Sequence, residues 1–193
     1  SDLVAAVAVL LWLVAGLRLV AWIRVRRPAQ GLLLLIFGGL AVSATFFSPD
    51  VYVFLGRVAG IPNVAEPVAR TGMLVAAWGA QELVQQLTTR RGAAYVTNRR
   101  RLRLLLLTVL SLWLLFIAAG VDTPTLHFTR GHGKEPLAAL YLLVSLAYLS
   151  IALVDVLLGD RRWAPSATPQ LRVGLRLIGL GCLFGCGYVV NKL

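Results

Sequence analysis

Apolar residues gather into six long runs along this chain, separated by short polar connections rich in Gly, Pro and Asp. A run of about 18 or more mostly apolar residues is typical of a helix that crosses a bilayer, because the hydrocarbon core offers no water to backbone groups and a helix satisfies them within one segment. The pattern therefore predicts an all-α fold, a polytopic transmembrane helix bundle that forms one domain over residues 1–193. Its six spanning helices are expected at residues 3–23, 31–47, 64–87, 104–121, 137–158 and 173–190.

The arginines predict the orientation of this bundle. Most of them lie in the connections 24–30, 88–103 and 159–172, whereas the alternate connections hold few. Arg and Lys accumulate in cytoplasmic loops, so we expect these three connections in the cytoplasm and the N-terminus outside the cell membrane. The excess of 19 Lys and Arg over 8 Asp and Glu then reflects topology and attraction to anionic lipid head groups rather than nucleic-acid binding. The connection 88–103 could also dock a partner.

The third run is unusually polar. Asn63 and Glu66 have the spacing of a helix N-cap and its capping-box partner, which would start this helix at the outer surface. Glu66 and Arg70 are four residues apart on one helix face and can form an ion pair. The pair either closes the helix end at the membrane surface or lines the mouth of an outward-facing cavity. Gln81 continues the same face.

Four ionisable residues share one predicted depth, about one turn from the cytoplasmic ends of their helices: Arg18, Glu82, Asp155 and Arg176. A charge inside the hydrocarbon costs free energy unless it is paired, hydrated or neutralised. The arginines can extend to the head groups while Asp155 reaches water. Alternatively, the four residues form an inner charge network, which is either structural or a gate or proton site at the cytoplasmic opening.

Two further stripes follow from helical spacing. Tyr141, Ser145, Tyr148, Ala152 and Asp155 fall on one face of the fifth run, where they either hydrogen-bond to neighbouring helices or line a ligand cavity. In the sixth run, small residues such as Gly181 and Gly185 stand four apart, which allows another backbone to approach closely. Helix packing within or between chains is the ordinary explanation, and a glycine hinge is the alternative.

Composition and missing motifs narrow the chemistry. The chain is 59% hydrophobic and 14% charged, which disfavours a water-soluble domain. It contains no HExxH zinc motif, no serine nucleophile elbow and no phosphate-binding glycine loop, so an enzyme is the weaker class. His127 and His132 share one connection without a third ligand nearby. We therefore predict no metal site and no cofactor.

Three stretches carry a resemblance, SPDVYVFLGRVAGIPNVAEPVARTGMLVAAWGAQELV, EPLAALYLLVSLAYLSIALVDVLL and LRVGLRLIGLGCLFGCGYVV. They are similar to a family of actinobacterial multi-pass integral membrane proteins classed as transporters. The resemblance implies a transporter-like activity with no defined substrate, and a seventh span with a cytoplasmic tail beyond the sixth. The family pattern would place a histidine where this chain has Arg70.

These observations together predict an integral membrane protein of transporter-like or ligand-sensing type, with a polar interior between its helices. The candidate ligand-binding or gating residues are Glu66, Arg70, Gln81, Glu82, Tyr141, Tyr148 and Asp155. The alternative is a membrane scaffold or accessory subunit, which would form a homo-oligomer or join a partner membrane protein through the glycine face of the sixth helix.

Overall fold

The described part of the chain is built from helices. The computed structural model describes residues 2–88, 98–119 and 136–163, and these residues form six helices and the turns between them. The helices are α1 (Asp2–Val25), α2 (Pro28–Phe46), α3 (Pro49–Ala59), α4 (Ala65–Thr88), α5 (Arg99–Ala119) and α7 (Pro136–Trp163). The predicted all-α class is therefore confirmed for these residues. The predicted span 173–190 lies outside them.

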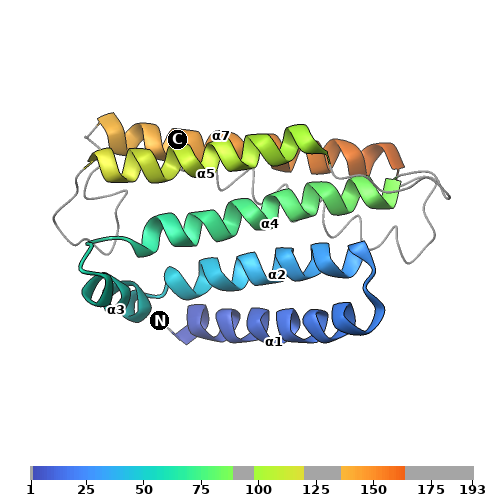
Figure 1. Cartoon of the computed structure of the whole chain (residues 1–193), viewed down its shortest axis with the longest axis horizontal. Coiled ribbons are helices and arrows are strands. Elements are labelled where there is room, and N and C mark those ends of the chain that lie inside the picture. The colour runs from blue at the N-terminus through green and yellow to red at the C-terminus, as the bar shows by residue number, and fades with distance from the viewer. Residues whose placement is uncertain (1, 89–97, 120–135, 164–193) are drawn as a thin grey trace.

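Helix α4 occupies the middle of the bundle (Figure 1). It packs against α2 on one side and against α5 and α7 on the other, while α1 packs on the far side of α2. Helices α1, α4 and α7 run in one direction, and α2 and α5 run in the other. The connection between α1 and α2, the end of α4 and the start of α5 consequently lie together at what we call the arginine-rich end. The opposite end, which carries α3, is called the α3 end.

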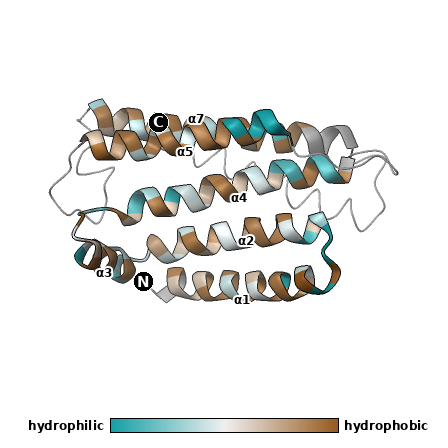
Figure 2. Ribbon diagram, in the orientation of Figure 1, coloured by the Kyte–Doolittle hydropathy of each residue, from teal (hydrophilic) through white to brown (hydrophobic). Residues whose placement is uncertain are grey.

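Polarity in this bundle is reversed relative to a water-soluble protein. Leu13 and Leu17 on α1 and Ile117 on α5 are each more than 60% exposed. Figure 2 shows α1, α2, α5 and α7 as largely hydrophobic, whereas α4 is hydrophilic toward both of its ends. Extended apolar surface of this kind marks contact with a membrane or with other proteins.

Four of the described helices are long and apolar enough to cross a membrane, and the qualifying segments are Val4–Val25, Pro28–Phe46, Arg99–Ala119 and Pro136–Leu158. They coincide with four of the six predicted spans. The predicted span 64–87 corresponds to helix α4 (Ala65–Thr88), but α4 is too polar to qualify by composition. The apolar helices are thus compatible with an integral membrane protein, while six crossings and an external N-terminus stay predictions.

The helix boundaries follow from local chemistry. Pro28 and Pro49 stand in the first turns of α2 and α3, where a missing N–H costs no hydrogen bond. Gly60 ends α3 in the left-handed conformation, with φ of 64°. Asn98 caps α5, because its side-chain Oδ1 accepts a hydrogen bond from the Arg100 amide at 3.1 Å.

The segment between the second and third predicted spans holds a helix that the sequence did not predict. Residues expected to form a connection instead form α3, whose 11 residues are too few to cross a bilayer. The turn that follows also differs from the predicted cap. Asn63 has φ of 60° and lies two residues before α4 begins, whereas an N-cap residue normally has an extended backbone.

Glycines allow α2 and α4 to pack backbone against backbone. A Cβ atom at Gly39 would lie 2.5 Å from the carbonyl oxygen of Gly72, and a Cβ at Gly72 would lie 2.6 Å from that of Gly39. Gly79 makes a third close approach, where a Cβ would lie 3.0 Å from Ile36. Small residues at helix crossings are the common means of close packing in membranes. The glycine-containing side of α4 therefore packs on α2, and the polar side chains of α4 face α5 and α7.

Candidate functional site

The polar residues of α4 are buried inside the bundle. Glu66 is 5% exposed, Gln81 6% and Glu82 0%. A helix with several charged and amide side chains is poorly suited to face lipid, and here α2, α5 and α7 cover it. The polar side chains form two clusters, one toward each end of α4.

The cluster at the α3 end consists of Glu66, Arg70, Tyr141 and Ser145. Arg70 donates a hydrogen bond through Nε to Glu66 Oε1 at 2.8 Å, which confirms that this i, i+4 pair forms an ion pair. Its Nη1 donates to Ser145 Oγ on α7 at 3.0 Å. The guanidinium carbon also lies 5.5 Å from the centre of the Tyr141 ring, within the range of a cation–π interaction. One arginine therefore ties α4 to α7.

A second hydrogen bond joins this end of α4 to α3. The buried Tyr52 hydroxyl donates to Asn63 Oδ1 at 3.1 Å. Burial raises the pKa of Tyr52 above its ordinary value, with Glu66 adding to the shift and Arg70 opposing it. The hydroxyl therefore stays neutral and remains a hydrogen-bond donor.

The cluster at the arginine-rich end centres on Arg101 of α5. Arg101 Nη2 lies 2.7 Å from Asp155 Oδ2 on α7, and its Nη1 donates to Gln85 Oε1 on α4 at 2.6 Å. A longer contact of 3.9 Å joins Arg101 to Glu82 Oε1. Gln81 completes the cluster, because its Nε2 donates to Asp155 Oδ2 at 3.1 Å. A single guanidinium thus connects α4, α5 and α7.

Glu82 also contacts the start of α5. Its Oε2 accepts a hydrogen bond from the backbone N–H of Asn98 at 3.2 Å. The N-terminus of a helix carries partial positive charge, so a carboxylate placed there is favoured. Tyr148 on α7 is also buried, and its hydroxyl has no hydrogen-bond partner among the described residues.

Most of the predicted site residues come together in this arrangement. The stripe on the fifth run lies on the buried face of α7, where Tyr141 and Ser145 are 0% exposed and Tyr148 is 8% exposed. The hydrogen bond from Arg70 to Ser145 joins residues 75 positions apart in the sequence, and the one from Gln81 to Asp155 joins residues 74 apart. Because this separation is nearly constant, α4 and α7 run parallel along this stripe. The prediction that α7 presents a polar face to its neighbours is confirmed.

The predicted inner charge network needs one correction. Glu82 and Asp155 do share a cation, but that cation is Arg101 and not Arg18. Arg18 belongs to α1, which packs on α2, so α2 and α4 separate it from α7. Arg176, together with the glycines at 181 and 185, lies outside the described residues.

The sequence did contain a signal for Arg101. Among the arginines that open α5, it alone stands at helical spacing from the buried Leu105 and Leu112, whereas Arg100 and Arg103 are exposed. An arginine that continues an apolar buried stripe is expected to point inward. Counting arginines for topology grouped it with the surface residues and missed this role.

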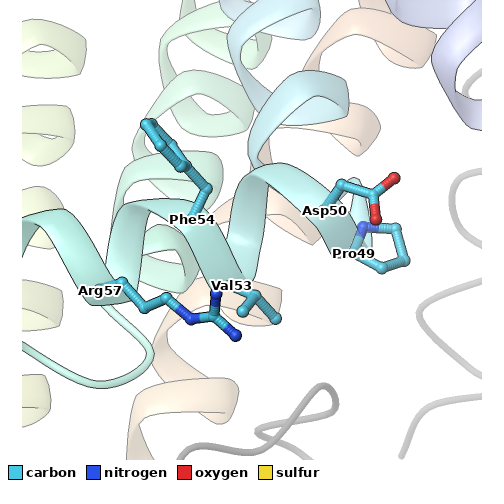
Figure 3. A pocket seen from close by; sticks show the side chains of 5 residues that line it. All are labelled: Pro49, Asp50, Val53, Phe54 and Arg57. Carbon is cyan, nitrogen blue, oxygen red and sulfur yellow. The ribbon is translucent and has the colours of Figure 1, made fainter.

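Within the described ranges, no group of three or more His, Cys, Asp or Glu side chains is placed to hold a metal ion. His127 and His132 fall outside those ranges. A hollow of about 410 Å³ lies on α3, away from the two clusters, and is lined by Pro49, Asp50, Val53, Phe54 and Arg57 (Figure 3).

Comparison of the chain with protein-family models, with curated proteins and with solved structures finds no match.

Proposed function

We propose that this chain is a multi-pass integral membrane protein of transporter-like or ligand-sensing type. In this proposal, α1, α2, α5 and α7 cross the cell membrane and α4 crosses among them as a polar central helix. The arginine-rich end lies in the cytoplasm, which leaves the N-terminus outside. The similarity to actinobacterial transporters agrees with this proposal and stays a prediction.

The observation that carries the proposal is the pair of polar clusters at the two ends of α4. Arg70 joins α4 to α7 at the α3 end, and Arg101 joins the same helices at the arginine-rich end. Between them the facing surfaces are mainly apolar, with Leu74, Leu112 and Leu149 among the buried residues. Opening either cluster would expose the interior to one side of the membrane, as alternating access requires.

The cluster at the arginine-rich end, which we call the inner cluster, also has the chemistry of a gate. Arg101 and Asp155 are both partly exposed, with side-chain exposures of 24% and 39%, whereas Glu82 is fully buried. Breaking the bond between Arg101 and Asp155 would let α7 separate from α4 and α5 at this end. Glu82 would then come into contact with water or with a charged solute.

Thiol accessibility tests the proposal. Cys182 and Cys186 are first replaced by Ala, and Ala77→Cys is introduced midway between the clusters, where Ala77 packs against the buried core. The protein in liposomes is treated with a charged, membrane-impermeant methanethiosulfonate reagent from each side. We expect slow labelling of Ala77→Cys, and faster labelling from the arginine-rich side when Glu82→Gln or Asp155→Asn loosens the inner cluster.

The matched control is Leu110→Cys at a similar depth on α5, because Leu110 is 56% exposed on the apolar surface. A thiol in lipid stays protonated and unreactive, so this variant should not label in any background. If Ala77→Cys is as unreactive as Leu110→Cys in all backgrounds, the interior is closed packing and the scaffold alternative is favoured. The scaffold alternative would then be tested by measuring the oligomeric state of the purified protein.

The proposed lipid partners follow from charge at the arginine-rich end. Arg24, Arg26, Arg27, Arg99, Arg100 and Arg103 are exposed there. Basic side chains near a cytoplasmic leaflet are attracted to anionic head groups by about 1 kcal/mol each. We expect anionic lipids to bind at this end and to orient the bundle.

A further inference from the structure

Helix α3 presents an apolar face that no described part of the chain covers. Phe54 is 65% exposed and Val58 is 68% exposed, and Ile61 in the following turn is 50% exposed. Tyr52, on the opposite face of α3, is buried against the bundle. The face that points away from the bundle also carries two charges, Asp50 and Arg57, which line the hollow described above.

The place of α3 in the chain fixes its position along the bundle axis, at the α3 end. It begins three residues after α2 ends at Phe46, and α4 begins six residues after α3 ends at Ala59. It therefore stands where one candidate span ends and the central helix begins. Figure 3 shows α3 running across the other helices rather than along them.

Three features hold α3 at this level. Its buried Tyr52 is hydrogen-bonded to Asn63, and it contacts both α2 and α4. Pro49 and the left-handed Gly60 define its two ends. The helix is thus attached to the bundle by one face, which leaves the apolar face in a fixed direction.

We propose that α3 is a membrane-interface helix that binds the phospholipid bilayer at the α3 end. The inference rests on the membrane placement proposed above. Phe54 and Val58 lie among the upper acyl chains, while Arg57 contacts lipid phosphate. An amphipathic helix with this arrangement lies in the interface plane with its apolar face about 5–10 Å into the boundary between head groups and acyl chains.

The charges agree with this placement. Arg57 can extend its aliphatic stem along the apolar surface while its guanidinium reaches the phosphate layer. In Figure 3, Phe54 and Arg57 extend in different directions from neighbouring positions on the outward face of α3, so the ring can enter the acyl region while the guanidinium stays among the head groups. Asp50, two helical turns from Arg57, is placed to meet the ammonium group of a phosphatidylethanolamine molecule across the hollow.

Depth measurement by electron paramagnetic resonance tests the inference. The full chain, with Cys182→Ala and Cys186→Ala, is placed in nanodiscs of phosphatidylethanolamine and phosphatidylglycerol. A nitroxide is attached at Val58→Cys, Arg57→Cys or Leu110→Cys, and its collision rates with oxygen and with a water-soluble nickel chelate are compared. We expect the oxygen-to-nickel ratio to be highest at Leu110, intermediate at Val58 and lowest of the three at Arg57. All three ratios should be higher than that of the free label in buffer.

Each other outcome overturns a defined part of the argument. A Val58 label with the ratio of the free label would place α3 in water. Low collision rates with both reagents at Val58 would mean that protein covers this face, either another segment of the chain or a second copy. A ratio higher at Arg57 than at Val58 would reverse the assigned face. If Leu110 also gives the ratio of the free label, the membrane placement itself fails, independently of α3.

Discussion

The close approach of α2 and α4 at Gly39 allows a prediction worked directly from the structure. The added methyl group in Gly39→Ala would meet the Gly72 carbonyl oxygen at 2.5 Å, whereas ordinary contacts begin at 3.4 Å. The difference, 3.4 − 2.5 = 0.9 Å, must come from separation of the two helices, because the clashing atom is backbone and cannot rotate away. A gap of about 0.5–1 Å already removes roughly a quarter to a half of the dispersion energy of the contacts it opens.

We expect Gly39→Ala to lower the free energy of unfolding by about 1–3 kcal/mol, the usual cost of overpacking. Gly72→Ala should cost a similar amount, because its Cβ would lie 2.6 Å from the Gly39 carbonyl oxygen. The double variant should cost less than the sum of the two, since one separation of the helices relieves both clashes. Unfolding by SDS in mixed micelles, followed by far-ultraviolet circular dichroism, measures these differences.

Gly38 provides the matched control on the same helix. A Cβ there would meet no atom within 4 Å, so Gly38→Ala brings no clash. Alanine is also the better helix former by about 1 kcal/mol, so this variant should be as stable as the parent or more stable. Equal destabilisation by Gly38→Ala and Gly39→Ala would refute the proposed backbone contact between α2 and α4.

Three other substitutions test the polar contacts by thermal unfolding in detergent. Arg101→Gln should lower the free energy of unfolding by about 2 kcal/mol. This value lies between the costs of breaking an exposed and a buried ion pair, because the guanidinium is partly exposed. The exposed neighbour Arg100→Gln should change stability by less than about 0.5 kcal/mol, and a similar loss in both would argue against the inner cluster. Glu82→Ala should destabilise the protein more than Gln86→Ala, because only Glu82 accepts the Asn98 amide at the start of α5; equal shifts in melting would remove that role. Tyr52→Phe should cost about 1 kcal/mol through loss of its hydrogen bond to Asn63, and no change would show that α3 is held by other contacts.

Sequence reasoning succeeded where a single helix decides the outcome. The spacing of Glu66 and Arg70 predicts an ion pair because residues four apart share a helix face, and the pair forms at 2.8 Å. The spacing of Tyr141, Ser145 and Tyr148 likewise predicts a common face, which is the buried face of α7. Each of these conclusions needs only the 3.6-residue period of the helix.

Sequence reasoning failed where one helix had to be placed against another. Arg18 lies seven residues before the end of α1 and Arg101 two residues after the start of α5, both toward the arginine-rich end, and helical spacing alone does not tell which neighbouring helix either of them faces. The structure selects Arg101, because α5 packs on both α4 and α7 whereas α1 packs on α2. The contact between Gly39 and Gly72 was missed for the same reason, since small residues allow close approach without naming the partner.

The sequence by itself determined the class of this protein. Its long apolar runs specify helices, most of its arginines lie in three alternate connections between these runs, and its third run is too polar to face lipid alone. All of these follow from local composition and from the energy of placing polar groups in hydrocarbon. Only the tertiary structure decided that this polar helix stands at the centre, with one arginine joining it to its neighbours near each end. That arrangement depends on which helix surfaces fit together, a property of side-chain shape and packing that no single segment contains.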